Sequence, residues 1–188
     1  MRKTALPLLL AALAASGCGR LLDINLFVVG EQTALERQVL GAYGELDRSL
    51  LAYSSVRGVQ PDGSLRPPPP MSESQRTVQQ AMQNRQYNRD DLDLLLAYKL
   101  VAERNDGLIE ATVQPFPDVE RITSELVARI LEEENADRAA IMARLLATVP
   151  GLRPGDEADV RWVFASLNQG IAPEGSLLQR RDGEWTTK

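Results

Sequence analysis

The sequence predicts a mainly α-helical domain with a short N-terminal strand and a C-terminal β-hairpin. Apolar residues recur every three or four positions in several long stretches, which is the spacing of one helix face. Residues 22–29 alternate at first and then become fully apolar before Gly30, as is typical of a strand. Near the other end of the chain, Asp182-Gly183 separates two short segments and favours a tight hairpin turn.

The start of the chain has the features of a bacterial secretion signal. Two positive charges precede an uninterrupted apolar run over residues 5–14, which is too short to span a bilayer as a helix. Residues 15–18, Ala-Ser-Gly-Cys, match the lipobox of bacterial lipoproteins. We therefore expect a signal peptide over residues 1–17, lipidation of Cys18, and a tether and strand over residues 18–30.

Cys18 is the only cysteine in the chain, so an internal disulfide is excluded. A buried free thiol or an ordinary secretory signal are the alternatives to lipidation. Each buried methylene contributes about 0.8 kcal/mol, so a three-chain anchor would hold the protein permanently on the membrane. Gly19, rather than Asp, follows the cysteine, and resemblance to enterobacterial lipoproteins then implies an outer-membrane anchor with the domain on the periplasmic face.

The region 31–131 is predicted to be helical, with a proline-rich loop over residues 54–71. Thr33 and Glu36 form a capping box that opens a helix to about Tyr53. A second capping box, at Ser72 and Gln75, opens a polar helix to about Arg85, and Asn88 with Asp91 begins a third that stops at Gly107. The longest of the predicted helices is expected to run from residues 116–118 to Pro150-Gly151.

The region 132–188 completes the domain with two helical segments and the hairpin. Asp156 is expected to cap a helix whose apolar stripe is Val160, Val163, Phe164 and Leu167. The predicted two-residue turn places Leu178 and Trp185 on the same face of the hairpin. Trp185 is therefore expected to pack against that stripe; the alternative is an exposed tryptophan that anchors a partner.

The composition excludes several classes of function. The chain has no histidine, so Cys-His catalysis, Ser-His-Asp triads and the usual zinc sites are excluded, and no metal or cofactor is expected. Its net charge is −5 at pH 7. An acidic chain does not attract nucleic acid through its overall field. The remaining catalytic candidates are the carboxylates of Glu132-Glu133-Glu134 and Asp90-Asp91-Asp93, which we interpret as solvated helix faces.

The C-terminal third, from Glu132 to Lys188, resembles the YdbL-like family of periplasmic proteins, whose domain is of unknown function. The pattern is carried by Asn135 and Arg138 on a helix, a second helix, and a closing stretch. This stretch contains Pro173-Glu174-Gly175-Ser176, Asp182-Gly183-Glu184-Trp185 and the terminal lysine. The chain departs from the short secreted members in its lipid anchor and in the segment from Leu35 to Pro117.

The resemblance implies an accessory role in envelope maintenance, beside AsmA-like proteins that bridge the two membranes for lipid transfer. We therefore expect a non-catalytic interaction or assembly factor, held at the membrane by its lipid and bound to an envelope protein. Asn135, Arg138 and Trp185 are the candidate partner-binding residues. The alternative is an enzyme that acts on peptidoglycan or another envelope glycan through carboxylates such as Glu133 and Asp137.

Overall fold

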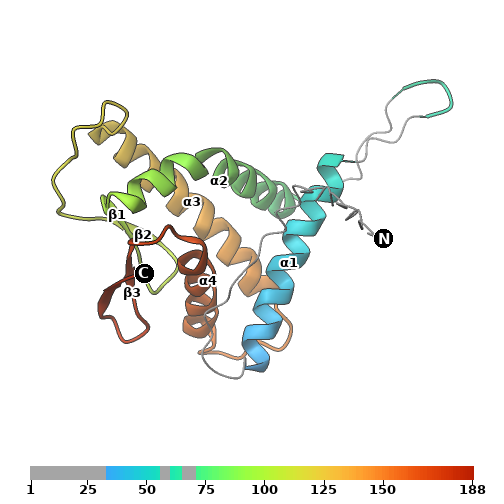
Figure 1. The fold of residues 1–188 in the computed structure, drawn as a ribbon. Coiled ribbons are helices and arrows are strands. Elements are labelled where there is room, and N and C mark those ends of the chain that lie inside the picture. Colours follow the sequence, from blue (N-terminus) through green and yellow to red (C-terminus); the bar gives the residue numbers. More distant parts are fainter. Residues whose placement is uncertain (1–32, 56–59, 65–70) are drawn as a thin grey trace, which may run out of the picture.

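The computed structural model describes residues 33–55, 60–64 and 71–188. Within them, helices pack together and four short strands form a small sheet at one end (Figure 1). The helices are α1 (Ala34–Ser55), α2 (Glu73–Ala97), α3 (Ser124–Thr148) and α4 (Glu157–Ile171), and the strands are β1 (Val101–Glu103), β2 (Ile109–Ala111), β3 (Leu177–Gln179) and β4 (Trp185–Thr187). The predicted fold class, mainly helical with a C-terminal hairpin, is confirmed.

Several predictions fall on residues that the structure does not describe. The signal peptide over residues 1–17, the lipidation of Cys18 and the strand over residues 22–29 lie outside the described residues, as does most of the proline-rich loop. In the described part of the chain, no helix is long and apolar enough to cross a membrane.

Helix α1 begins at the predicted capping box. The backbone N–H of Thr33 donates to Glu36 Oε2 at 2.6 Å, and the N–H of Glu36 donates to Thr33 Oγ1 at 3.1 Å. The helix ends at Ser55, two residues beyond the expected position. Its apolar stripe, with Val39 fully buried at the centre, packs against α3 and α4.

Helix α2 is one continuous helix where the sequence suggested two. The capping box at Ser72 and Gln75 is present, but Asn88 lies inside the helix and is buried rather than being a second cap. The helix ends well before Gly107, at a turn in which Lys99 adopts a left-handed φ of +57°. The N–H of Leu100 donates to the carbonyl of Leu95 at 2.9 Å, which is the hydrogen bond of a Schellman motif.

A hairpin of β1 and β2, which the sequence pattern did not predict, follows α2. Its turn, Arg104-Asn105-Asp106-Gly107, is the counterpart of Arg180-Arg181-Asp182-Gly183 in the C-terminal hairpin. In each turn the arginine N–H donates to the carbonyl of the residue after the glycine, at 2.9 and 2.8 Å, and the glycine N–H donates back to the arginine carbonyl. Gly107 and Gly183 have φ values of +85° and +91°, as this three-residue turn requires.

The extra turn residue shifts the C-terminal hairpin by one position from its predicted register. Leu178 is opposite Thr186, and Trp185 is opposite Gln179. A shift of one residue moves every side chain of a strand to the other face. The prediction that Leu178 and Trp185 share a face is therefore wrong: Leu178 is buried, whereas Trp185 is 39% exposed.

The start of α3 and the capping of α4 differ from the prediction, whereas α4 begins directly after Asp156 as expected. Helix α3 begins at Ser124 with Thr123 as its N-cap, whose Oγ1 accepts from the N–H of Leu126 at 3.2 Å, and not at residues 116–118. Asp156 precedes α4 but does not cap it, because its carboxylate instead accepts from the N–H of Arg153 at 2.9 Å. The predicted end of the longest helix, before Pro150-Gly151, is confirmed.

The sheet joins segments that are far apart in the sequence. Its strand order is β2-β1-β3-β4, with β1 and β3 parallel at Glu103 and Leu178, and the outer pairs antiparallel. Every residue of β1 is buried, and every residue of β4 is exposed. The sheet therefore has two edge strands, β2 and β4, of which β4 is exposed throughout, and a buried centre at β1.

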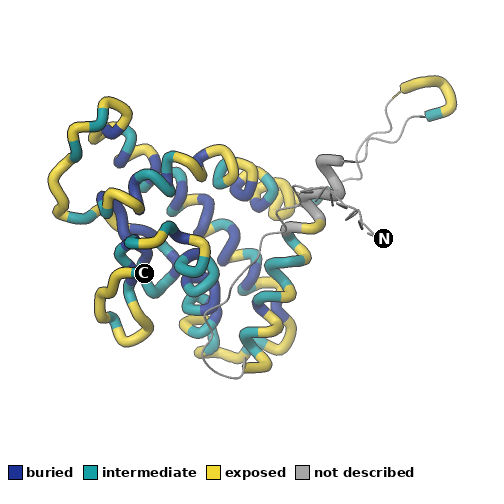
Figure 2. Tube along the Cα trace, viewed as in Figure 1, coloured by how far each residue is buried: buried dark blue, intermediate teal, exposed yellow. Residues whose placement is uncertain are grey.

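The interior contains two apolar clusters, seen as the dark stretches of the tube in Figure 2. One holds Val78 and Met82 of α2 with Ile141 and Leu145 of α3, against α1 and α4. The other holds later residues of α2 and earlier residues of α3 against the sheet. Between them lie buried polar side chains: Asn88, Glu103, Glu134, Asp137, Arg138 and Asn168. We call this group the polar layer.

Candidate functional site

Arg138 of α3 lies at the centre of the polar layer. Its guanidinium donates from Nη1 and Nη2 to the two carboxylate oxygens of Glu103 on β1, at 2.6 and 2.8 Å. Nη1 also donates to the carbonyl of Gly107 in the β1–β2 turn at 3.1 Å. Both charged side chains are only 1% exposed. Arg138 therefore attaches α3 to the central strand of the sheet.

Glu134 joins the same arginine to α2 and α4. Its Oε1 accepts from Nε of Arg138 and from Nε of Arg85 at 2.9 Å. Arg85 also donates from Nη2 to Asn168 of α4 at 2.7 Å, and its guanidinium lies 5.8 Å from the centre of the Phe164 ring. Glu134 Oε2 is buried and accepts no hydrogen bond from any described residue.

The electrostatics of the polar layer keep its central groups charged. Burial works to raise the pKa of Glu134, but Arg85 and Arg138 outweigh it and leave that pKa below its usual value of 4.5. Burial alone would lower the pKa of Arg138, and the carboxylates of Glu103 and Glu134 raise it instead. Removal of one member would thus leave an uncompensated buried charge.

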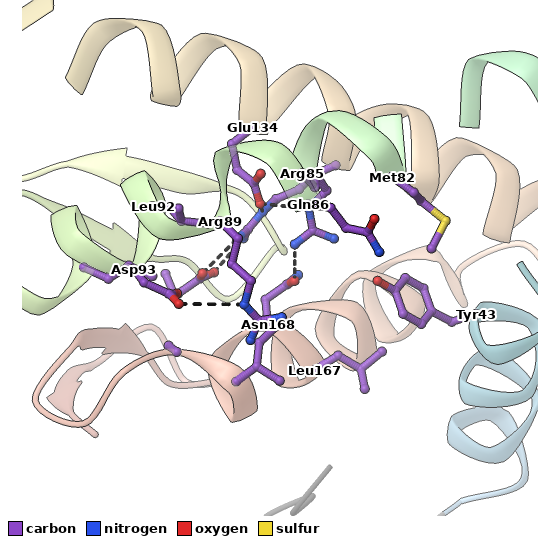
Figure 3. A pocket seen from close by; sticks show the side chains of 15 residues that line it. Tyr43, Met82, Arg85, Gln86, Arg89, Leu92, Asp93, Glu134, Leu167 and Asn168 are labelled. Carbon is purple, nitrogen blue, oxygen red and sulfur yellow. Dashed lines mark hydrogen bonds and ion pairs between the residues drawn. The ribbon is translucent and has the colours of Figure 1, made fainter. Parts of the chain in front are cut away.

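A cavity of about 190 Å³ opens beside the polar layer, between α2 and α4 (Figure 3). Figure 3 shows Tyr43 and Met82 at one end and Leu92 with Asp93 at the other, while Arg85 reaches toward Glu134 and Asn168. The remaining walls are mainly apolar and include Leu96, Leu167, Ile171 and Ala172. An apolar cavity with a few converging polar groups is the usual form of a small-molecule site.

The carboxylate candidates on α3 differ in their burial and contacts. Glu134 is buried, so the interpretation of Glu132-Glu133-Glu134 as a solvated face is wrong for that residue. Glu133 pairs with Arg129 at 3.2 Å and accepts from Asn88 at 2.7 Å. Burial raises the pKa of Asp137, against the opposing effect of a hydrogen bond from Asn84. These carboxylates hold α3 against α2.

The acidic group at Asp90-Asp91-Asp93 also has partners within the domain. Asp91 forms ion pairs with Arg121 and, at 3.0 Å, with Arg129. Asp93 lies 3.7 Å from Arg89, and partial burial raises the pKa of Asp93 even though Arg89 opposes the shift. Of this group, Asp93 alone is among the residues that line the cavity.

Asn135 and Arg138, the first two candidate partner-binding residues, point into the domain. The Asn135 side chain exchanges two hydrogen bonds of 2.9 Å with the backbone N–H and carbonyl of Ile109, as a neighbouring strand would. Arg138 binds Glu103 and Glu134 as described above. Both residues therefore have internal structural contacts.

Trp185, the third candidate, lies on the exposed edge strand. It is 39% exposed and belongs to neither apolar cluster. The stripe of α4 that was expected to cover it, with Val160, Val163 and Phe164, is instead buried against the other helices. The prediction that α4 covers Trp185 is therefore wrong.

Comparison of the chain with models of known families, with curated proteins and with solved structures returned no match. Among the residues that the structure describes, no group of three or more acidic or cysteine side chains is placed to hold a metal ion. The candidate sites are therefore those that the geometry itself defines, namely the cavity beside the polar layer and the edge at Trp185.

Proposed function

We propose that this chain is an outer-membrane lipoprotein, anchored through Cys18, that acts as a non-catalytic interaction factor in cell-envelope maintenance. The lipobox at residues 15–18 supports the anchor. Resemblance of residues 132–188 to YdbL-like proteins supports a partner among AsmA-like proteins that carry lipids between the two membranes.

The observation that carries the proposal is the exposed Trp185 on the edge strand β4. Interface residues with large effects on binding are enriched in tryptophan, and an edge strand has unpaired backbone groups that a partner strand can bind. The domain behind it is braced by the polar layer, in which Arg138 ties α3 to β1. A rigid domain that exposes a tryptophan on an edge strand is suited to binding another protein.

The experiment is a crosslinking pull-down of the acylated protein from envelope fractions. Trp185→Ala should lower recovery of an AsmA-like partner at least tenfold, because a tryptophan hot spot contributes about 2 kcal/mol or more to binding. Tyr87→Ala is the matched control, since Tyr87 is an aromatic residue of α2 that is 87% exposed. Equal recovery with both variants would contradict a partner site at Trp185.

A further inference from the structure

The two hairpins of the sheet have the same internal structure. Each follows a helix, and in both the turn has the same hydrogen bonds and a glycine with positive φ. The three residue pairs of each hairpin also face each other in the same register. Each outer strand begins two residues after its turn glycine, β2 at Ile109 and β4 at Trp185. Ile109 and Trp185 are therefore equivalent positions on the two edges of the sheet.

Helix α3 covers the edge of the sheet at Ile109. The side-chain amide of Asn135 bonds to both the N–H and the carbonyl of Ile109, each at 2.9 Å, so these two backbone groups point away from β1. The Ile109 side chain is 2% exposed and belongs to the same apolar cluster as Ile130 of α3. At this edge, a neighbouring element thus satisfies the backbone and covers the side chain of the first strand residue.

Strand β4 has the same outward backbone groups without such a cover from the described residues. Glu184 and Lys188 are bonded across the hairpin at 2.8 and 2.9 Å. Because inward and outward positions alternate along an antiparallel strand, the N–H and carbonyl groups of Trp185 and Thr187 point away from β3. Among the described residues, the only hydrogen bond to these groups is one of 3.5 Å from Oγ1 of Thr186 to the Thr187 carbonyl. This edge therefore presents two donor and acceptor pairs.

An extended chain segment fits this edge better than a single side chain. Trp185 and Thr187 have the spacing of alternate residues in a strand, so one extended neighbour can bond to both. A side-chain amide, such as that of Asn135 at the other edge, satisfies only one residue. Strand β4 consists of aromatic and β-branched residues, which favour sheets, and it contains neither a proline nor a charge that would keep a further strand away.

We infer that the partner binds by adding an extended segment to the sheet beside β4. This mode of binding rests on the proposed function and specifies how its partner is recognised. The backbone of the segment pairs with Trp185 and Thr187. One of its apolar side chains covers the Trp185 ring, as α3 covers Ile109 at the opposite edge.

Two substitutions of Thr187 separate recognition of the backbone from recognition of the side chain. Thr187→Pro removes one outward N–H but no hydrogen bond between β3 and β4, and such an edge position tolerates proline. Recovery of the AsmA-like partner in the crosslinking pull-down should fall at least about tenfold, because the donor is lost and the ring blocks the added strand. Thr187→Ala is the matched control, since it keeps the N–H, and its recovery should stay within about twofold of that of the unmodified protein. Thermal unfolding of both variants checks that the hairpin is intact.

A second measurement needs neither the named partner nor a variant. A phage-displayed library of random linear peptides is selected on the acylated protein, and hydrogen exchange followed by NMR locates the peptides that bind. The amides of Trp185 and Thr187 should exchange at least about tenfold more slowly with peptide bound, because each becomes hydrogen-bonded. The amide of Ala111, which occupies the position of Thr187 on β2, is the control and should exchange at an unchanged rate.

The possible failures can be told apart. Recovery that falls with Trp185→Ala, but not with Thr187→Pro, would overturn strand addition and leave a partner site at Trp185. Selected peptides that protect both amides, in a protein that recovers no AsmA-like partner, would overturn the proposed partner and support strand addition. A library without any peptide that protects both amides would overturn strand addition. Protection of both amides in a dimer of this chain alone would also overturn it, because a second copy would then occupy the edge.

Discussion

The guanidinium of Arg138 faces the carboxylate of Glu103 along two hydrogen bonds, with both side chains 1% exposed. One residue belongs to the middle of α3 and the other to the central strand of the sheet. The pair therefore links α3 directly to the central strand of the sheet.

Arg138→Met should destabilise the protein by about 3–5 kcal/mol, because it leaves the carboxylates of Glu103 and Glu134 buried without their main partner. The measurement is urea unfolding at neutral pH. Arg161→Met is the matched control: its side chain is 36% exposed and its ion pair with Glu157 lies on one helix face, so the loss should stay under about 1 kcal/mol. Similar losses in the two variants would contradict the bracing role of Arg138.

Leu178→Ala should cost more stability than Trp185→Ala, although tryptophan is the larger residue. Leu178 belongs to the apolar cluster beside the sheet, and its truncation should cost about 2–5 kcal/mol. Trp185 faces the other way and is 39% exposed, so its truncation should cost about 1 kcal/mol. Thermal unfolding of both variants measures the difference. A larger loss for Trp185→Ala would contradict this hairpin register and support the one predicted from the sequence.

Gly107→Ala should be more destabilising than Gly183→Ala, even though both glycines occupy the same turn position. Both have a positive φ, which costs an alanine about 1–2 kcal/mol. A Cβ at Gly107 would also lie 2.8 Å from Cδ1 of Phe164, whereas a Cβ at Gly183 meets nothing within 4 Å. The extra cost at Gly107 should be about 1–3 kcal/mol in chemical denaturation. Equal losses of stability in the two variants would show that the Phe164 side chain moves aside at no cost.

The lowered pKa of Glu134 makes it a source of acid sensitivity. Its folded pKa lies below the unfolded value of 4.5, so its contribution to stability is fully present above that value and is lost as the pH falls through the folded pKa. NMR titration of the carboxyl carbon should show Glu134 ionising below pH 4.5. Titration of Glu134 above that value would contradict the pairing with Arg85 and Arg138.

Cys18→Ser should release the protein from the membrane fraction of a producing bacterium, because the acceptor of the lipid is removed. Fractionation and intact mass together measure the effect. The unmodified protein should carry the added mass of an acylated N-terminus, and a mature protein without that mass would refute the anchor.

Local signals predicted the parts of the fold that depend on neighbouring residues. The capping boxes at Thr33 and Ser72 and the helix end before Pro150-Gly151 need only a few adjacent positions, and all three are present. The end of α2 could not be found in this way, because Lys99 occupies the left-handed position that is usually glycine. Asp106-Gly107 offered the same turn signal as Asp182-Gly183, and the apolar run before it was assigned to a helix instead.

The polar layer could not be predicted from periodicity, since its partners come from different elements. The polar gap in α3 contains Glu134 and Arg138, and their partners Arg85 and Glu103 lie 49 and 35 residues away. A gap flanked on both sides by apolar residues of the same helix is a signal that such a stretch is buried. Charge alone favoured the solvent-exposed interpretation.

The parallel pairing of β1 with β3 makes the sheet depend on a contact between residues far apart in the sequence. Each hairpin closes over a few residues, but the N–H of Asn105 bonds to Gln179, 74 positions further along the chain, beside that central pair. Closing so long a loop carries an entropic cost before any contact repays it, and distant contacts of this kind slow folding. The helices α3 and α4 lie between the two strands in sequence, so we expect the two hairpins to join into one sheet more slowly than either hairpin closes.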